Sequence, residues 1–549
     1  MKLRQLLSWR FSLIFFHRWL GILVGLMLVA WSISAVVLLY YGIPHYTAGE
    51  RLDRLRALDL GSISITPQEA LAKVGGTPFR LRISMHEKRP VYRINTGTVF
   101  GNWTMVYADT GEVMNRVSRD DSIFLLADMY PEFAANMSYE FPMTDPDMFT
   151  HSPGLQNYMP MHRIAINDDA DTRIYVAEKS GDIVMRTDNT SRFFGFMGYN
   201  LHTLFFFRQA SWWTPLLSWL SWIGLIMTVL GLVLGIWRFS RKPIYIKRGD
   251  AYRTPYVGWW RWHHYAGLIF GALMLTWVLS GLVSIGQIPG FAESAYTTDQ
   301  INAGARTLQG FGAATDFAPL SISGIQHAAD AIGEIFPIKE LELLYQNGVP
   351  YFLAYRAPTE DELTHWVSRS ALDFNNLTLE QEHRFIAATG LDAQPFVDFS
   401  EAELLNAAAR AMPDAAITEQ TWLTEFDDYY YYTISSFDLG LPRPVKTLPV
   451  LRLKYDDPNE TWLYLTPSHG QMLKLEAIDR RNRWGYYGLH GLDFAALYNN
   501  RPLWDIVVIF LLLGCLTLSV TTLVPMFRRV KRHFFRLLHV GRWLFPHDK

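Results

Sequence analysis

The sequence contains one cysteine, Cys515, among 549 residues. A single thiol excludes a disulfide framework, a cysteine-ligated iron–sulfur cluster and a CxxCH site for covalently attached haem. Charged residues are also scarce, at 19% of the chain, against about 25% in soluble domains. The chain has no GxGxxG and no P-loop motif, so we expect no nicotinamide or flavin domain within it. With half of its residues hydrophobic, the composition indicates a membrane protein.

Four apolar segments have the length of a transmembrane helix, which needs about 20 residues. They cover 19–41, 209–237, 262–292 and 506–527. A soluble protein could bury one such segment in its core, but four of them predict four membrane spans.

Basic residues are concentrated in three short segments next to these spans. Residues 1–18 carry four Lys or Arg and no acid, while 238–261 and 528–549 carry seven each against one acid each. The remaining chain holds 32 basic and 50 acidic residues. Because short cytoplasmic segments are enriched in Lys and Arg, we expect both termini and the middle connector in the cytoplasm. No small-residue cleavage site follows the first span, which predicts an uncleaved anchor.

The two long segments between the spans have the pattern of α+β domains. Alternating apolar residues around Gly111, Gly181 and Gly470 predict strand–turn–strand units, and Thr66 with Pro67 predicts a helix start. The expected fold is therefore four transmembrane α-helices with two α+β extracytoplasmic domains. The expected boundaries are a cytoplasmic N-terminus and first helix (1–42), a first outer domain (43–190), an interfacial segment and second helix (191–238), a cytoplasmic loop (239–261), a third helix (262–292), a second outer domain (293–480), an interfacial segment and fourth helix (481–527), and a cytoplasmic tail (528–549).

The chain contains an internal duplication. A histidine, two glycines, a tryptophan and a serine recur at offsets of 0, 4, 8, 14 and 17 residues. The first copy has His17, Gly21, Gly25, Trp31 and Ser34, and the second has His263, Gly267, Gly271, Trp277 and Ser280. Two further histidines also match, because His202 follows Gly181 by 21 residues and His490 follows Gly470 by 20. Each half is thus predicted to consist of a helix, then an outer domain and then a second helix.

These four histidines are the candidate ligands of a cofactor. On the first helix a histidine is followed by glycines at i+4 and i+8, on one helix face, which leaves a flat slot where a porphyrin can pack against backbone. The third helix has the same surface, so His17 and His263 can face one another at the cytoplasmic side. His202 and His490 precede the second and fourth helices and are expected at the outer edge. The pattern predicts two stacked bis-histidine haem b sites, suited to electron transfer because no iron coordination position stays open.

Zinc binding and helix dimerisation account for these residues less well. Zinc takes four ligands, and neither pair has a nearby acid or thiol. Helix dimerisation through small residues explains the glycines but not the histidines. A single histidine at a helix end is typically an interfacial anchor, whereas four in matching contexts favour ligation. His264 is the alternative to His263, and the register of the repeat favours His263.

The same residues carry a family resemblance. The runs HRWLGILVG at His17, WHHYAGLIFGALMLTWVLSGLV at Trp262, LHTLF at Leu201 and YGLHGLDF at Tyr487 resemble the PepSY-associated transmembrane family. Members of this bacterial inner-membrane family include ferric-siderophore reductases. The resemblance implies that the outer domains are PepSY-like and that His17, His202, His263 and His490 are axial ligands of two b haems, with the glycines lining the sites.

The function that follows is transmembrane electron transfer to a ferric siderophore or similar metal chelate outside the cytoplasm, with release of ferrous iron. Since the cytoplasmic connector is too short for a cofactor domain, electrons must come from a separate donor, a membrane quinol or a cytoplasmic flavoprotein. We expect the lipid bilayer as the surroundings of the helices, and no nucleic-acid partner.

Two alternatives belong to other classes. The chain could be a non-redox PepSY-type module that binds or inhibits a peptidase, with structural histidines. It could also handle copper, because residues 137–162 hold five methionines and two histidines, and thioether and imidazole suit Cu(I); a loop that packs its methionines on the domain is the competing interpretation. Tyr429–Tyr432 could stack a planar siderophore, although a strand face is the simpler interpretation.

Overall fold

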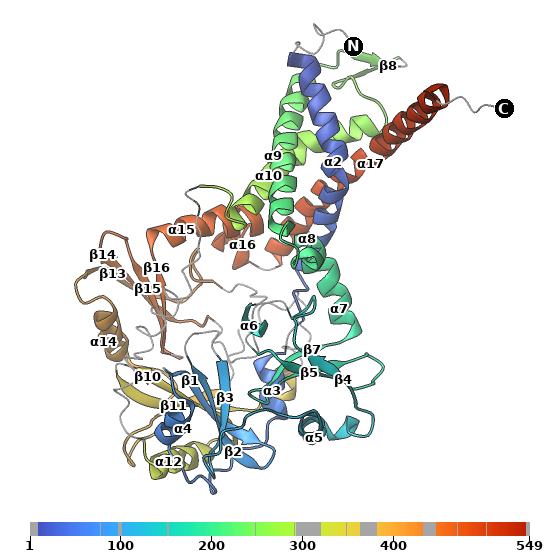
Figure 1. The fold of residues 1–549 in the computed structure, drawn as a ribbon. Coiled ribbons are helices and arrows are strands. Elements are labelled where there is room, and N and C mark those ends of the chain that lie inside the picture. Colours follow the sequence, from blue (N-terminus) through green and yellow to red (C-terminus); the bar gives the residue numbers. More distant parts are fainter. Residues whose placement is uncertain are drawn as a thin grey trace, which may run out of the picture. The chain divides into compact units, whose positions relative to one another are not determined.

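The computed structural model divides the chain into two compact units. It describes residues 9–44, 46–76, 78–96, 102–150, 153–156, 158–247, 249–289, 291, 320–346, 348–362, 382–431, 446–468, 470–500 and 502–544. Residues 1–39, 196–292 and 481–549 form what we call the helical unit, and 40–195 with 293–480 form the sheet unit. The chain is drawn in Figure 1.

Four long helices make up most of the helical unit. They are α2 (Trp9–Leu38), α9 (Trp213–Arg238), α10 (Trp259–Ser284) and α17 (Leu503–Leu544). All four are long and apolar enough to cross a membrane, α17 over Leu503–Phe535, so the protein is a multi-pass membrane protein with four candidate spans. Helices α9 and α17 each pack against both α2 and α10. The duplicated helices α2 and α10 therefore lie diagonally opposite one another in a four-helix ring.

Short elements complete the helical unit. They are the π-helical turn η2 (Phe196–Asn200), α8 (Leu201–Thr203), η3 (Phe205–Phe207), the hairpin β8 (Tyr245–Lys247) and β9 (Asp250–Tyr252), the π-helical turn η5 (Trp484–Gly491) and α16 (Ala495–Tyr498). The turns η2 and η5 occupy matching places, each ahead of the last long helix of its half.

The sheet unit is built around one antiparallel sheet of six strands. Its order is β12 (His383–Ala387), β11 (Val349–Arg356), β10 (Ile338–Gln346), β1 (Pro78–His86), β2 (Arg89–Thr96) and β3 (Asn102–Tyr107). Three strands come from the segment before α9 and three from the segment after α10. The two segments meet where β1 pairs with β10, so strands far apart in sequence share one sheet (Figure 1).

The register of β1 on β10 is symmetric. Both strands have nine residues, and the fifth residues of the two strands, Arg82 and Glu342, lie opposite one another. The third and fifth residues of β1 are Arg80 and Arg82, and the third and fifth residues of β10 are Glu340 and Glu342. Ion pairs cross the junction diagonally, at 2.5 Å between Arg80 and Glu342 and at 3.4 Å between Arg82 and Glu340.

Helices α4 (Pro67–Val74) and α12 (Ile322–Gly333) pack on this sheet. Ala70 and Ile325 lie in the same buried cluster as Leu81 and Leu341. The predicted start of α4 is confirmed: the Thr66 hydroxyl accepts from the Glu69 N–H, and Pro67 is the first helical residue. This capping arrangement satisfies donors that the helix leaves open.

The sheet unit also contains two four-stranded antiparallel sheets. One is β4 (Ser138–Met143), β5 (Met161–Ala165), β6 (Arg173–Ala177) and β7 (Ile183–Thr187); the other is β13 (Ala416–Leu423), β14 (Val450–Asp456), β15 (Trp462–Thr466) and β16 (Gln471–Leu475). The remaining elements are α3 (Ala48–Arg54), α5 (Arg119–Met129), η1 (Pro131–Phe133), α6 (Pro153–Gln156), α7 (Asn189–Gly195), α14 (Glu401–Ala411) and α15 (Ala477–Arg483). The predicted turn glycines Gly111, Gly181 and Gly470 have φ of 72°, 64° and 58°, a region that favours glycine.

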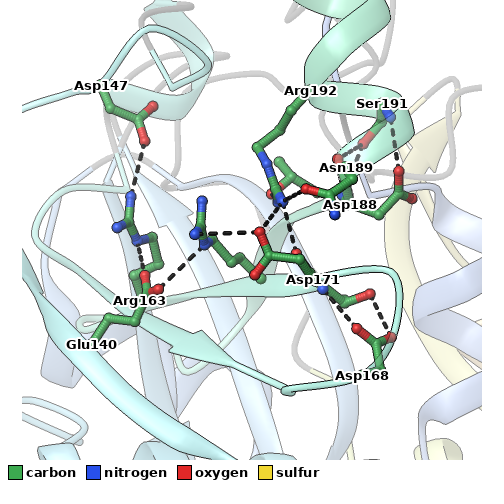
Figure 2. Close-up of polar contacts among 12 residues, drawn as sticks. Glu140, Asp147, Arg163, Asp168, Asp171, Asp188, Asn189, Ser191 and Arg192 are labelled. Atoms are coloured by element: carbon green, nitrogen blue, oxygen red, sulfur yellow. Dashed lines mark hydrogen bonds and ion pairs between the residues drawn. The ribbon is translucent and has the colours of Figure 1, made fainter.

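A chain of alternating charges links the sheet β4–β7 to α7 (Figure 2). Arg163 contacts Glu140, Arg173 lies 3.2 Å from Glu140 and 3.4 Å from Asp171, and Arg192 of α7 lies 2.5 Å from Asp171. These contacts hold α7 on its sheet, and α7 continues directly into η2, which precedes His202.

A second ionic cluster is fully buried in the sheet unit. We call Arg51, Arg82, Arg93, Asp182 and Glu340 the ionic cluster; each is at most 7% exposed. Arg51 donates to both carboxylate oxygens of Glu340 at 2.6 and 2.9 Å, and Asp182 lies 3.1 Å from Arg82 and 2.9 Å from Arg93. Burial alone would raise the pKa of Glu340, but the charges of Arg51 and Arg82 lower it to about 2. The cluster ties both sequence segments into one core.

Candidate functional site

The structure brings the first two candidate histidines together. His17 on α2 and His263 on α10 face one another with ring centroids 6.3 Å apart and ring planes inclined by 32°. They come from the diagonally opposite helices of the ring, so they meet in its interior. We call them the first pair.

Backbone carbonyl groups orient both rings of the first pair. His17 Nδ1 lies 3.0 Å from the carbonyl oxygen of Met227, and His263 Nδ1 lies 3.2 Å from that of Leu518. A carbonyl oxygen can only accept, so each Nδ1 carries the proton and each Nε2 has a free lone pair. Neither Nε2 has a hydrogen-bond partner among the described residues.

The other two candidate histidines also meet. His202 in α8 and His490 in η5 have ring centroids 6.1 Å apart, with the planes almost perpendicular at 86°. Tyr486 stacks on His490 at 5.2 Å. We call these histidines the second pair. Along α2, the 17 residues from His17 to Ser34, which contacts His202, span about 25 Å at 1.5 Å per residue.

Irregular backbone presents the second pair. Both histidines lie close to π-helical turns, because η2 ends two residues before His202 and η5 contains His490. Two residues after each histidine, Leu204 and Leu492 have φ of 50° and 55°. Branched residues avoid this left-handed region, and both π-turns and such strain concentrate at functional sites. The same irregularity in both halves therefore marks the second pair as a site.

Serine hydroxyl groups orient the rings of the second pair. Ser34 Oγ lies 3.0 Å from His202 Nδ1, and Ser280 Oγ lies 2.9 Å from His490 Nδ1. Each hydroxyl donates its proton to a carbonyl three residues earlier, Ser34 to Trp31 at 3.1 Å and Ser280 to Trp277 at 3.0 Å. Each serine oxygen therefore accepts from the histidine, which leaves Nε2 of both rings unprotonated and, within the described chain, without a partner.

His264 has a different environment from His263. Its Nδ1 lies 2.7 Å from the Thr254 hydroxyl and its Nε2 lies 2.8 Å from the Gly235 carbonyl oxygen. Both nitrogens are engaged, so this ring offers no lone pair to a metal ion. The geometry favours His263 over His264 as a ligand.

A cavity of about 460 Å³ lies beside the first pair, within the range of small-molecule and cofactor pockets. All four glycines singled out in the sequence, Gly21, Gly25, Gly267 and Gly271, line it. A Cβ on Gly21 would meet no atom within 4 Å, so the absent side chain leaves open space in the cavity. The helices therefore form a cradle between the two imidazoles.

Other residues of the cavity were not identified from the sequence. Gly231 and Gly235 of α9 line it, as do Arg18, Arg238 and Arg529. A Cβ on Gly231 would lie 2.6 Å from His17 Cε1, so glycine is needed there for the observed ring position. The spacing of four between Gly231 and Gly235 repeats that of Gly21 and Gly25 and is the signal that could have found them.

The pair distances allow a test of fit to haem. Metal–imidazole bonds are about 2.0–2.1 Å and a ring nitrogen lies roughly 1 Å from the ring centre, so imidazoles on opposite sides of one metal ion have centres roughly 6 Å apart. Both observed separations agree with this value. In addition, metal-bound histidines usually donate the other ring N–H to a fixed acceptor, as all four do here. Both pairs therefore have the ligand geometry of a bis-histidine haem site, and the cavity beside the first pair offers space for a macrocycle.

The methionines of the stretch 137–162 pack to different degrees, since Met148 is 38% exposed whereas the other four are buried in or packed against apolar clusters of the sheet unit. Met143 and Met161 are 3% and 0% exposed in one apolar cluster. His162 is engaged at both nitrogens, with Tyr139 at 3.0 Å and the Val117 carbonyl at 2.8 Å. His151 lies outside the described residues, as does Tyr432 of the tyrosine run. Four of the five methionines therefore pack as the domain-core interpretation expects, and Met148 does not.

Comparison with known proteins identifies a family. A profile described as PepSY-associated TM region matches residues 14–529, nearly the whole chain. No curated protein matches the chain.

Proposed function

Because the chain belongs to the PepSY-associated TM region family, we propose that it is a di-haem membrane protein that transfers electrons to a ferric siderophore or similar chelate. The observation that carries the proposal is the set of four histidines, paired at 6.3 and 6.1 Å, each with Nδ1 engaged and Nε2 open. The proposed location is the bacterial inner membrane, with both termini in the cytoplasm and the sheet unit in the periplasm, since basic residues flank the spans at the termini and connector.

The proposed ligands are His17 and His263 for one b haem, and His202 and His490 for the other. When bound, haem iron supplies a reversible one-electron couple. With two imidazoles as ligands, each iron would have no open position for oxygen or substrate, so the protein's task would be to hold the rings and keep water away. Between the pairs, Val24, Leu28, Met274, Val278 and Cys515 form a buried apolar cluster that serves this insulation.

The arginines of the cavity are proposed partners of the two propionate groups of haem b. Arg18, Arg238 and Arg529 line the cavity that adjoins the first pair. The Nε atom of Arg238 is buried and has no hydrogen-bond partner among the described residues. Guanidinium groups bind carboxylates through charge-assisted hydrogen bonds, so these residues would favour an amphipathic, dianionic ligand over a neutral one.

The electron balance of the proposed reaction is simple. Each ferric complex gains one electron and becomes ferrous, and the siderophore is released because its oxygen donors prefer the harder Fe(III). The electrons come from a donor of the quinol or reduced-flavoprotein class. One quinol, oxidised to quinone with release of two protons, supplies two ferric complexes. The chelate would accept electrons on the side of the sheet unit without binding to the haem iron.

The first experiment is an absorbance spectrum of the full-length protein purified with haem supply. We expect a low-spin b-type spectrum and two haems per chain. If no Soret band forms under conditions where a control cytochrome incorporates haem, the redox proposal is wrong and the peptidase-binding alternative gains support. Bound copper without haem would support the copper-handling alternative instead.

The second experiment tests the acceptor. Protein in proteoliposomes is reduced and then mixed with a ferric siderophore and a ferrous chelator. We expect reoxidation of the haem and trapping of ferrous iron. A protein lacking His202 and His490 should lose this activity while its remaining haem can still be reduced. Native reoxidation rates in that variant would contradict the two-haem relay.

A further inference from the structure

The two histidine pairs differ in what accepts the Nδ1 proton. In the first pair the acceptors closest to Nδ1 are the carbonyl oxygens of Met227 and Leu518. In the second pair they are side-chain hydroxyls, Ser34 and Ser280. A backbone carbonyl is present whatever residue occupies the position, whereas a hydroxyl depends on the side chain. The hydroxyl contact of each ring in the second pair therefore comes from a replaceable side chain, whereas in the first pair a hydroxyl, Thr521 at 3.3 Å from His263 Nδ1, is only a second contact.

Burial and position in the repeat place both serines for contact with the Nδ1 atoms of His202 and His490. Ser34 and Ser280 are 0% exposed, and they occupy the same offset from the histidine of their helix in the duplicated pattern. Each hydroxyl proton is used by a carbonyl of its own helix, at 3.1 and 3.0 Å. The only remaining role of each serine oxygen toward the ring is that of acceptor. This fixes the Nδ1–H tautomer, which leaves a lone pair on Nε2 of each ring.

The tryptophan before each serine belongs to the same arrangement. Trp31 Nε1 donates to the backbone carbonyl of His202 at 2.7 Å, while its own carbonyl accepts from Ser34 and lies near the His202 ring. The backbone of His202 and its ring are thus both held from one turn of α2. In the second half, Ser280 contacts the His490 ring and the carbonyl of Trp277 lies near it, whereas Trp277 Nε1 has no hydrogen-bond partner among the described residues.

From these contacts we infer that Ser34 and Ser280 are positioning residues that orient the outer haem ligands His202 and His490 and set the reduction potential of the haem they hold. The inference rests on the proposed function. A hydrogen bond from Nδ1–H to an acceptor increases the electron donation of the imidazole through Nε2, and such contacts are known to tune metal affinity and potential. Stronger donation favours the ferric state, so loss of the acceptor should shift the potential to a more positive value.

The test is an optical redox titration of full-length, haem-loaded variants. Ser34→Ala and Ser280→Ala should each shift the midpoint of the second-pair haem to a more positive potential and leave the first-pair haem unchanged. Ser34→Thr keeps a hydroxyl that can bond the same helix carbonyl, so it should restore the native midpoint. The second-pair component is assigned as the one missing from His202→Ala protein.

Ser32→Ala is the matched control. Ser32 is a buried serine of the same helix whose hydroxyl donates to the Leu28 carbonyl at 2.8 Å, so its loss should move neither midpoint. If Ser34→Ala instead loses the second haem while Ser32→Ala and Ser34→Thr keep both, the positioning role is also supported. Unchanged midpoints in both alanine variants at full haem content would overturn the inference, whereas a wild-type protein without haem would overturn the proposed function itself.

Discussion

The two units of this protein bury polar groups in opposite ways. In the sheet unit, the carboxylates of the ionic cluster are matched by guanidinium groups of the same cluster, for example Arg51 with Glu340 at 2.6 Å. In the helical unit, the four paired imidazoles are each satisfied at Nδ1 and open at Nε2. Polar groups in protein interiors are normally hydrogen-bonded, and an exception calls for a physical reason.

This difference separates structural polar groups from a site. In the ionic cluster both carboxylates are paired with guanidinium groups, so the cluster needs no ligand and ties chain segments together. A buried imidazole with an open lone pair leaves a desolvation cost of about 1–3 kcal/mol that a ligand can remove. If this distinction is correct, substitutions of the paired histidines should change haem binding, and substitutions in the ionic cluster should change stability.

Loss of a ligand should have the largest effect and remove one haem completely. His17→Ala and His263→Ala should each eliminate the first-pair haem and retain the other, and His202→Ala and His490→Ala should do the reverse. The measurement is haem per chain with the residual spectrum. His264→Ala is the control, since both of its nitrogens are already engaged; loss of the first haem in that variant but not in His263→Ala would reverse the assignment.

Breaking the ionic cluster should affect stability and leave haem content alone. Glu340→Ala strips Arg51 and Arg82 of a shared partner, and an unpaired buried charge costs about 3–5 kcal/mol. The measurement is the unfolding temperature of the purified protein beside its haem content. Asp171→Ala is the control: Asp171 is 45% exposed in the charge chain of Figure 2, where an ion pair contributes about 0–1 kcal/mol. Equal unfolding temperatures for the two variants would contradict the prediction.

Acid should destabilise the sheet unit through His86. Burial, and next the charge of Arg93, lower the pKa of His86 to about 4. The unfolded chain binds this proton from about pH 6.5 downward and the folded chain only near pH 4, so stability falls as the pH drops through that window. The slope is at most about 1.4 kcal/mol per pH unit, or roughly 3 kcal/mol in total.

The measurement is unfolding of wild type and His86→Gln from pH 7.5 to 4. The difference in stability between the two proteins at each pH isolates the contribution of His86 from that of the carboxylates, which also titrate in this range. Parallel stability curves for the two proteins would show that His86 is not the sensor.

The smallest expected effect comes from a matched pair of glycines on α9, one at the first site and one outside it. Gly231→Ala places a methyl group where His17 Cε1 would lie 2.6 Å away, and such overpacking costs about 1–3 kcal/mol. We expect several-fold weaker retention of the first haem. Gly224→Ala, two turns earlier on the same helix and outside the cavity lining, places its Cβ 3.6 Å from Val278, an ordinary contact, and should retain the first haem. The measurement is haem loss to apomyoglobin, and equal loss rates would contradict the cradle described for this cavity.

Much of this architecture could be predicted from the sequence. The spans follow from four apolar segments, and the pairing of His17 with His263 and of His202 with His490 follows from the offsets of the repeat. The acceptors of the first pair could not be predicted, because Met227 and Leu518 act through carbonyl groups that every residue has. Ser34 and Ser280 were visible as repeated residues, but their role depends on backbone turns that bring the second pair to them.

The joining of the two strand-rich segments was also not predictable. The alternating pattern identifies β1 and β10 as strands but contains no information on which edge each will pair with. That choice depends on the edges left free once the hairpins β1–β2 and β10–β11 have formed. The cavity, similarly, results from four helices together, and only the glycines on α2 and α10 were evident beforehand.

The register between β1 and β10 has a consequence for how such a chain could be divided. Two copies of β1 in the same register would set Arg82 against Arg82, and two copies of β10 would set Glu342 against Glu342. In the intact chain the opposing residues have opposite charge. If the polypeptide were expressed as two halves, separated in the connector between α9 and α10, each half would repel its own kind at this edge and select the other. The charges on this central strand pair therefore favour pairing between the two different halves over pairing between two copies of either half.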